Sequence, residues 1–246
     1  SGNDWAPARM LTQLPAPDDL ASVALVDLLG NGTACLVWSS PLPGDAGRQM
    51  RYVDLMAGEK PHLLVGTKNN LGAETRIHYG ASTQFYLQDR LAGTPWLTRL
   101  PFPVHLVDRV ELFDAIGKTR FASRYAYHHG YYDQVEREFR GFGMVEQWDT
   151  ESFAALSGDA AVNLDEATAL PPVLTRTWFH TGAYLNGARV SLIFKDEYYR
   201  EPGLDQAAID AMLLPDTVLP PGLSAHEERE ACRALKGAVL RQEIYA

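Results

Sequence analysis

Alternating side chains in residues 119–149 constrain the fold of this chain more than any other feature. Between residues 120 and 128 two sets interleave: Phe121, Ser123, Tyr125 and Tyr127 on one side, and Arg120, Arg124 and His128 on the other. A period of two is typical of a β-strand, whose successive side chains point to opposite faces. Residues 135–140 alternate as well, and Gly141 and Gly143 then predict a bulge or a turn. This half of the chain is predicted to be β.

Strand and turn patterns also precede this stretch. Two apolar runs flank a glycine-rich turn at Gly30–Gly32, which predicts a hairpin. The later runs "RQMRYVDLM", "PHLLVGTKN", "ETRIHYGASTQFYLQD" and "FPVHLVDRVELFD" continue the strand pattern. Residues 1–22 are rich in proline and are predicted to be irregular.

The pattern changes after Thr150. Residues 151–170 predict a linker with a short helical piece, and Asn186–Gly187 predicts the turn of a second hairpin. A short helix is expected from about Asp205 to Pro215. A second helix is marked by a capping box of Ser224 and Glu227, with Gly237 as its stop, and "AVLRQEIYA" then resumes as a strand.

Composition narrows the classes of function. The chain has 246 residues, 46% of them hydrophobic, and 22 basic against 31 acidic residues give a net charge of −9. No basic run is present, so nucleic acid and anionic lipid are not the expected partners. The apolar runs fall short of the roughly 20 residues that a membrane helix needs, so no membrane insertion by this segment is expected. Cys35 and Cys232 are expected to be free, buried thiols.

The turn "DLLGNGTAC" is the weak candidate for a metal site. Asp27 and Asn31 occupy two positions of a calcium-type loop, but Leu29 stands between them and Cys35 follows. Calcium takes about six to eight oxygen ligands, which this loop does not offer. A glycine hairpin is the simpler interpretation, and no metal and no cofactor are predicted.

His128, His129 and Asp133 are the candidate for a transition-metal or acid–base site. Adjacent residues of a strand face opposite ways, so the two histidines do not easily share one metal. Histidines and aromatics at the end of a hairpin are the simpler interpretation.

Two further classes of site remain as alternatives. Carboxylates such as Glu138 and Glu146 could form the pair of a carbohydrate hydrolase, although interleaved arginines favour charge pairing on a strand surface. The aromatic segments 177–184 and 196–199 could instead line the groove of an adhesion or ligand-binding module. No nucleophile elbow, phosphate loop or dinucleotide motif is present, so no catalytic residue is predicted.

Several strings resemble one known family. "LVDLLGNGTACLVWSSPLP", "YVDLMAGEKPHLLVGTKNNLGAETRIHYGASTQFYLQD", "LPFPVHLVDRVELFD" and "SRYAYHHGYYDQVEREFRGFGMVEQWDTE" are similar to a region of the B component of bacterial insecticidal toxin complexes. SpvB-type virulence proteins and Rhs-like shell proteins share this region. Further strings to residue 246 resemble its continuation.

The resemblance implies an architecture and partners. It implies a mainly β fold: an antiparallel Rhs-type sheet with Tyr-Asp motifs, an FG-GAP propeller-like strand pair at the N-terminus, and a few short helices after residue 150. It also implies a non-catalytic segment of a secreted toxin, assembled in the bacterial cytoplasm, whose β-shell encloses a toxic C-terminal effector. The implied partners are other segments of the same polypeptide and the A and C components of the complex. Contacts between copies through exposed strand edges are a further expectation.

The same resemblance divides the chain into parts. The expected parts are an irregular segment 1–22, a propeller-like tail 23–60, an Rhs-like sheet 61–150, a linker 151–222 with a hairpin and a short helix, and a segment 223–246 with a capped helix and the start of the next shell strand. The residues expected to build the wall are Tyr125, Tyr127, Tyr131, Tyr132, Asp133, Phe139, Phe142 and Trp148.

Overall fold

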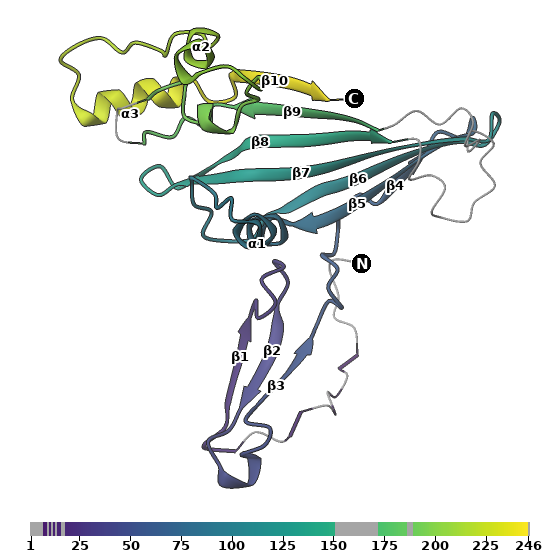
Figure 1. Cartoon of the computed structure of the whole chain (residues 1–246). Coiled ribbons are helices and arrows are strands. Elements are labelled where there is room, and N and C mark those ends of the chain that lie inside the picture. The colour runs from purple at the N-terminus through teal and green to yellow at the C-terminus, as the bar shows by residue number, and fades with distance from the viewer. Residues whose placement is uncertain are drawn as a thin grey trace. The chain divides into compact units, whose positions relative to one another are not determined.

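Figure 1 shows a computed structural model of the chain, which divides into two compact units. The structure describes residues 7–8, 10, 12, 14–15, 18–150, 172–185 and 189–245. One unit comprises residues 1–63 and 102–104, and the other comprises residues 64–101 and 105–246. The predicted linker helix in residues 151–170 and the turn at Asn186–Gly187 lie outside the described residues.

The first unit is a three-stranded antiparallel sheet. Its strands β1 (Ser22–Val26), β2 (Cys35–Ser39) and β3 (Met50–Asp54) pair in chain order, and a 3-10 turn, η1 (Pro43–Asp45), follows β2. Val26 pairs with Cys35, which confirms the hairpin predicted around Gly30–Gly32. The side chains of Cys35 and Trp38 are buried, and the Arg51 guanidinium lies 5.2 Å from the centre of the Trp38 ring.

The second unit is built on a seven-stranded antiparallel sheet in which every strand pairs with its neighbours in the sequence (Figure 1). Its strands are β4 (Gly66–Lys68), β5 (Ala73–Ala81), β6 (His105–Asp114), β7 (Thr119–Asp133), β8 (Glu138–Thr150), β9 (Val173–Phe179) and β10 (Val239–Tyr245). The mainly β, antiparallel prediction is confirmed. The long alternating stretch of the sequence forms β7 and β8, the central pair of this sheet.

The predicted bulge lies in β8. Gly130 pairs with Phe142 while Tyr132 pairs with Phe139, so β8 has one extra residue between these pairs. Gly141 lies within this interval at a φ of 88°, a left-handed conformation that glycine adopts without steric cost.

Among the described residues, the second unit has the helical segments α1 (Ser82–Ala92), η3 (Lys195–Glu197), α2 (Gln206–Ala211) and α3 (Ala225–Ala234). The side chain of Asp205 caps α2, and Ser224 and Glu227 form the predicted capping box of α3. Within the described residues, each helix is too short or too polar to span a lipid bilayer.

Helix α1 corrects two expectations. Residues 82–89 were predicted to continue a strand, and helices were expected only after residue 150. The structure has a helix there, with Ser82 and Phe85 buried three residues apart on one face and Gly93 ending it at a φ of 82°. Packing of Phe85 against Tyr127 of β7 favours the helix.

The turn predicted at Asn186–Gly187 lies outside the described residues, but the residues expected to follow it as a strand are described. Residues 189–194 form bends and turns, and β9 pairs instead with β8 and β10. The carboxylate of Asp216 accepts hydrogen bonds from the backbone N–H groups of Val190, Ser191 and Leu192 at 2.9, 2.5 and 3.2 Å. These N–H groups are satisfied without a strand partner.

The apolar core of the second unit lies over β8 and β9. Met144, Trp178, Phe194 and Tyr198 form its buried centre, and Ile193, Leu213 and Leu240 pack around them. Cys232 of α3 is buried with a free thiol, as is Cys35 in the first unit.

Candidate functional site

The Tyr-Asp pair of the sequence lies where β7 turns into β8. Asp133 ends β7, and its Oδ1 accepts hydrogen bonds from the backbone N–H groups of Val135 at 2.9 Å and Glu136 at 3.0 Å. The Tyr131 hydroxyl donates to Oδ2 of the same carboxylate at 3.5 Å. Asp133 therefore fixes the turn of the hairpin through the backbone.

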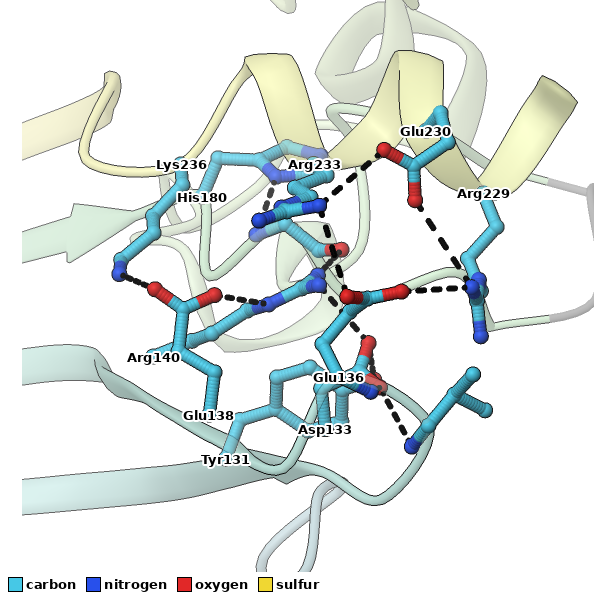
Figure 2. Close-up of polar contacts among 12 residues, drawn as sticks. Tyr131, Asp133, Glu136, Glu138, Arg140, His180, Arg229, Glu230, Arg233 and Lys236 are labelled. Carbon is cyan, nitrogen blue, oxygen red and sulfur yellow. Dashed lines mark hydrogen bonds and ion pairs between the residues drawn. The ribbon is translucent and has the colours of Figure 1, made fainter. Parts of the chain in front are cut away.

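A buried ion pair joins the two strands behind this turn (Figure 2). Arg140 Nη2 lies 2.9 Å from Asp133 Oδ2, and the two side chains are 0% and 3% exposed. Burial acts to raise the pKa of Asp133, but the N–H bond from Glu136 and the charge of Arg140 outweigh it, and the pKa is lowered. Asp133 is thus held as a carboxylate.

Arg140 also reaches a segment far away in the sequence. Its Nη1 donates to the backbone carbonyl of Gly182 at 2.8 Å, and its Nε donates to Glu138 Oε2 at 3.2 Å. Gly182 has a φ of 71°, and a Cβ there would lie 3.1 Å from the Cα of Arg233. Only glycine lets the backbone of α3 approach this closely while Arg140 holds the same residue.

Ion pairs at the rim attach the C-terminal end of α3 and the turn after it to the hairpin. Glu136 lies 3.1 Å from Arg229 and 3.8 Å from Arg233, and Glu138 lies 2.7 Å from Lys236. We call the set Asp133, Glu136, Glu138, Arg140, Arg229, Arg233, Lys236 and the Gly182 carbonyl the clasp. Figure 2 shows the labelled clasp residues of the hairpin facing those of α3 and of the turn after it.

The aromatic residues named in the sequence pack around β7 and β8. Phe142 lies 5.1 Å from Tyr127, 5.6 Å from Phe139 and 6.0 Å from Trp96, measured between ring centres. Tyr127 donates its hydroxyl to the Val107 carbonyl at 2.8 Å, and burial raises its pKa to about 12. Tyr132 donates its backbone N–H to the Arg99 carbonyl at 3.1 Å. Each of these residues has a packing or hydrogen-bond partner.

Tyr125 and Trp148 lie at the side of this cluster. Both line a hollow next to α1, and the Arg124 guanidinium lies 4.7 Å from the centre of the Trp148 ring.

The two adjacent histidines bind different groups. His128 Nδ1 lies 2.6 Å from Asp89 Oδ2 of α1, and its Nε2 lies 3.6 Å from Glu146 Oε2 of β8. Burial acts to lower the pKa of His128, but the two carboxylates outweigh it and raise the pKa to about 9. His128 is therefore a cation at neutral pH.

His129 has a φ of 57° and contacts another part of the unit. Its Nδ1 accepts the N–H of Leu97 at 3.1 Å, its Nε2 lies 2.9 Å from Glu197, and its ring stacks on Phe194. Across the described ranges, no three metal-binding side chains converge on one point.

The carboxylates considered for a hydrolase are all engaged by cations. Lys236 and Arg140 bind Glu138, and Arg176 and His128 bind Glu146. For Glu138 the Lys236 contact is the largest cause of a lowered pKa. For Glu146 burial acts to raise the pKa, but the contacts with His128 and Arg176 outweigh burial, and the pKa is lowered. A glycosidase acid requires a raised pKa, so neither residue fits that role.

Asp27 and Asn31 satisfy their own loop. Asp27 accepts the N–H groups of Asn31 at 3.0 Å and Gly32 at 2.8 Å, and Asn31 Oδ1 accepts the N–H of Thr33 at 3.0 Å. These oxygens stabilise the turn by accepting hydrogen bonds from its backbone N–H groups.

The aromatic segments 177–184 and 196–199 are mostly internal. Trp178 is 1% exposed, its ring lies 5.1 Å from Tyr198, and its indole N–H donates to Glu197 at 3.0 Å. His180 is buried between the Val190 carbonyl and the Gly182 N–H, and burial lowers its pKa. Tyr199 is half exposed and lines a hollow of about 210 Å³ with Tyr198 and residues of α2.

Sequence reasoning missed Arg140, Gly182, Asp89 and Glu197 as partners of the residues that it named. For Arg140 a signal exists: it follows Asp133 across a short turn, within reach on the paired strand. The others come from segments whose contact with β7 depends on the tertiary fold.

Comparison with known proteins gives one family and a group of solved structures. The profile of the family described as the insecticide toxin TcdB middle/N-terminal region matches residues 1–182. A search of curated proteins gave no match. A structure of TcdB2–TccC3–Cdc42 is 28% identical over 93% of this chain, with a TM-score of 0.73. A structure of TcdB2–TccC3–TEV is 29% identical over 94% of this chain, with a TM-score of 0.72. A Photorhabdus luminescens Tc holotoxin pore is 28% identical over 95%, with a TM-score of 0.68. This chain spans 10%, 11% and 11% of those three chains, respectively.

Proposed function

This chain belongs to the family of the insecticide toxin TcdB middle/N-terminal region, and on that premise we propose that it is a non-catalytic structural segment of a toxin-complex B component. Its role is to form part of a β-shell that encloses and delivers a toxic C-terminal effector. The shell carries no chemistry of its own and needs no cofactor.

One observation carries this proposal: the β7–β8 hairpin of the seven-stranded sheet is held by the buried Asp133–Arg140 pair, in the stretch that also holds the candidate reactive groups. In a continuous antiparallel sheet each internal strand pairs on both edges, which satisfies the backbone over a large area. The carboxylates of β7 and β8 are held ionised by cations and backbone N–H groups. These properties suit a sheet that forms the wall of the proposed shell.

The finer parts of the proposal follow from the relatives. TcdB2 is solved together with TccC3, and one solved form lacks a hypervariable C-terminal region. By analogy, the partners of this segment are other parts of its own polypeptide and the A and C components. The parent toxin is assembled in the bacterial cytoplasm and secreted. The first unit, with its strands β1 to β3, serves as the last, propeller-like part before the shell.

The edge strand β10 makes a second copy a further partner. Val239 and Ile244 on this strand are exposed, and β10 pairs only with β9 within the described sheet. An apolar, half-paired edge favours association. Light scattering of the isolated chain at high concentration is expected to show oligomers, and a monomer throughout the range would contradict this part.

A chimera tests the structural role. The matching segment of TcdB2 is replaced by this chain, and the chimera is produced together with TccC3. We expect an assembled complex in which the C-terminal region of TccC3 resists protease to the same extent as in a complex with unaltered TcdB2 measured beside it. An assembled, folded chimera that leaves this region open to protease would overturn the proposal.

The same chimera carrying Arg140→Ala tests whether this role depends on the clasp. Because Arg140 is the centre of the clasp, this variant is expected to lose the protection or the assembly. A chimera carrying Arg233→Gln, at the exposed rim, is expected to behave like the parent chimera.

A further inference from the structure

The sheet of the second unit contains a fork. The pairing of β6 with β7 ends at Arg109 and Arg124, although β6 begins at His105 and β7 continues to Asp133. The hydroxyl of Tyr127 bridges the gap by donating to the Val107 carbonyl at 2.8 Å. Helix α1 packs next to this opening, against β5 and β7.

A hollow of about 640 Å³ lies at the fork. Its volume falls within the roughly 300–1,000 Å³ of small-molecule sites. Side chains of α1, β5, β6, β7 and β8 line it, including the small Ala122 and Ala126 of β7. Because these two positions carry only a methyl group, the neighbouring large side chains leave space between them.

The lining of the hollow carries both acidic and basic side chains, so neither sign of charge dominates it. The acidic side chains are Asp89, Asp108 and Glu146, and the basic ones include Arg109, Arg124 and His128. His128 is held between Asp89 and Glu146, and Arg109 lies 3.3 Å from Glu111. A ligand with a net charge would face groups of its own sign on several sides.

Asp108 differs from the other acids. Its Oδ1 is buried and has no hydrogen-bond partner within the part of the chain that the structure describes. The Asp108 carboxylate lines the hollow, and a carboxylate accepts hydrogen bonds but donates none, so this position favours a ligand that donates. Gly80 lies beside the carboxylate, where a Cβ would be 3.3 Å from Oδ2 and 3.5 Å from the Gln84 amide oxygen. Asp108 and Gln84 thus offer acceptors at one end of the hollow.

We propose that the fork hollow binds a neutral, hydroxyl-rich small molecule of the monosaccharide or disaccharide class, with Asp108 as its principal hydrogen-bond acceptor. A hydroxyl group donates to Asp108 and accepts from a guanidinium at the same time. An ammonium group only donates and is repelled by Arg109, Arg124 and His128. A phosphate or carboxylate is repelled by the acidic side chains.

Aromatic side chains complete the site. Tyr125 and Trp148 line the hollow, and an aromatic ring packs against the apolar C–H face of a sugar ring. The proposal does not depend on the shell function, because it concerns a cavity within the second unit.

The test is ligand-observed NMR with the full 246-residue chain and a panel of glucose, galactose, mannose, N-acetylglucosamine, maltose and lactose, followed by calorimetry on any sugar that binds. Lysine, methylammonium and inorganic phosphate are the charged comparators. We expect saturable binding of at least one sugar and none of the comparators. Asp108→Asn is expected to weaken that binding about tenfold or more, because it removes a charge-assisted hydrogen bond.

Two further variants make the result decisive. Ala126→Leu fills the floor of the hollow without removing a polar group and is expected to abolish binding. Asp196→Asn, which changes an exposed acid on η3, is expected to bind like the parent chain. The proposal is overturned if no sugar binds the parent chain, if only a charged comparator binds, or if Asp108→Asn and Ala126→Leu bind as the parent does.

Discussion

The clasp and the fork both lie along β7, and they use charged side chains in opposite ways. In the clasp, Asp133 and Arg140 are buried, and each has several partners. In the fork, Asp108 has a buried oxygen without a donor beside a hollow of about 640 Å³. The comparison teaches that a buried charge holds a sheet together only where the fold supplies its partners. Where the fold leaves a partner out, as at Asp108 Oδ1, the buried oxygen is a cost to the folded chain.

Removal of the clasp arginine is expected to have the largest effect. Arg140→Ala leaves Asp133 buried without its cation and the Gly182 carbonyl without its donor, which is expected to cost about 3–5 kcal/mol of unfolding free energy. Hydrogen exchange of the β7 and β8 amides in increasing denaturant measures this loss of unfolding free energy in the second unit alone. A loss below 1 kcal/mol would mean that the clasp does not hold the sheet.

High pH is expected to lower the unfolding free energy of the chain, because His128 at the fork loses its charge. The folded-state pKa of His128 is about 9, above the ordinary 6.5, because Asp89 and Glu146 stabilise its charge. Its contribution is therefore complete below about pH 6.5 and is lost as the pH rises through about 9, a change of about 3 kcal/mol.

The measurement for His128 is the unfolding free energy from pH 6 to pH 10, beside His128→Gln as a variant that does not titrate. We expect the gap between parent and variant to narrow as the pH rises. A gap that stays constant over this range would show that the histidine is not held as a cation.

Substitution of Asp108, whose Oδ1 has no hydrogen-bond donor within the described residues, is expected to raise the unfolding free energy, whereas substitution in the clasp lowers it. Asp108→Asn replaces a buried charge with a neutral amide, which is expected to stabilise the ligand-free chain by about 1 kcal/mol. Thermal unfolding without any sugar checks the sign. Destabilisation of the same size would show that Asp108 is as well partnered as Asp133.

The exposed rim of the clasp is expected to contribute least. Arg233 is 42% exposed, so Arg233→Gln is expected to change the unfolding free energy by less than about 1 kcal/mol, and added salt should reduce even that. Unfolding at low and high sodium chloride measures it. A loss comparable to that of Arg140→Ala would place the strength of the clasp at its surface.

The two regions also differ in how far the sequence predicts them. The alternation of residues 119–149 predicts β7 and β8, and Gly141 marks the bulge, because these features depend on local backbone geometry. Ser224 and Glu227 likewise announce α3 through a cap that spans three residues. Elements with local causes are readable from the sequence.

The missed features have distant causes. Residues 189–194 form bends and turns where a strand was expected, and Asp216, about 25 residues away, accepts N–H groups that a strand would have paired. The sequence predicts a strand at residues 82–89, and the contact that favours helix α1 there is the distant packing of Phe85 against Tyr127 of β7. The fork depends on where the pairing of β6 and β7 stops, and no pattern in either strand marks that point.

A double-mutant cycle between Asp133 and Arg140 tests the central claim that this buried pair holds the sheet and serves no reaction. The unfolding free energies of Asp133→Asn, Arg140→Met, the double variant and the parent chain give the coupling energy. We expect a coupling of about 2 kcal/mol or more, with the double variant far less destabilised than the sum of the two single variants. A coupling near zero, with both single variants folded and as stable as the parent, would contradict the claim.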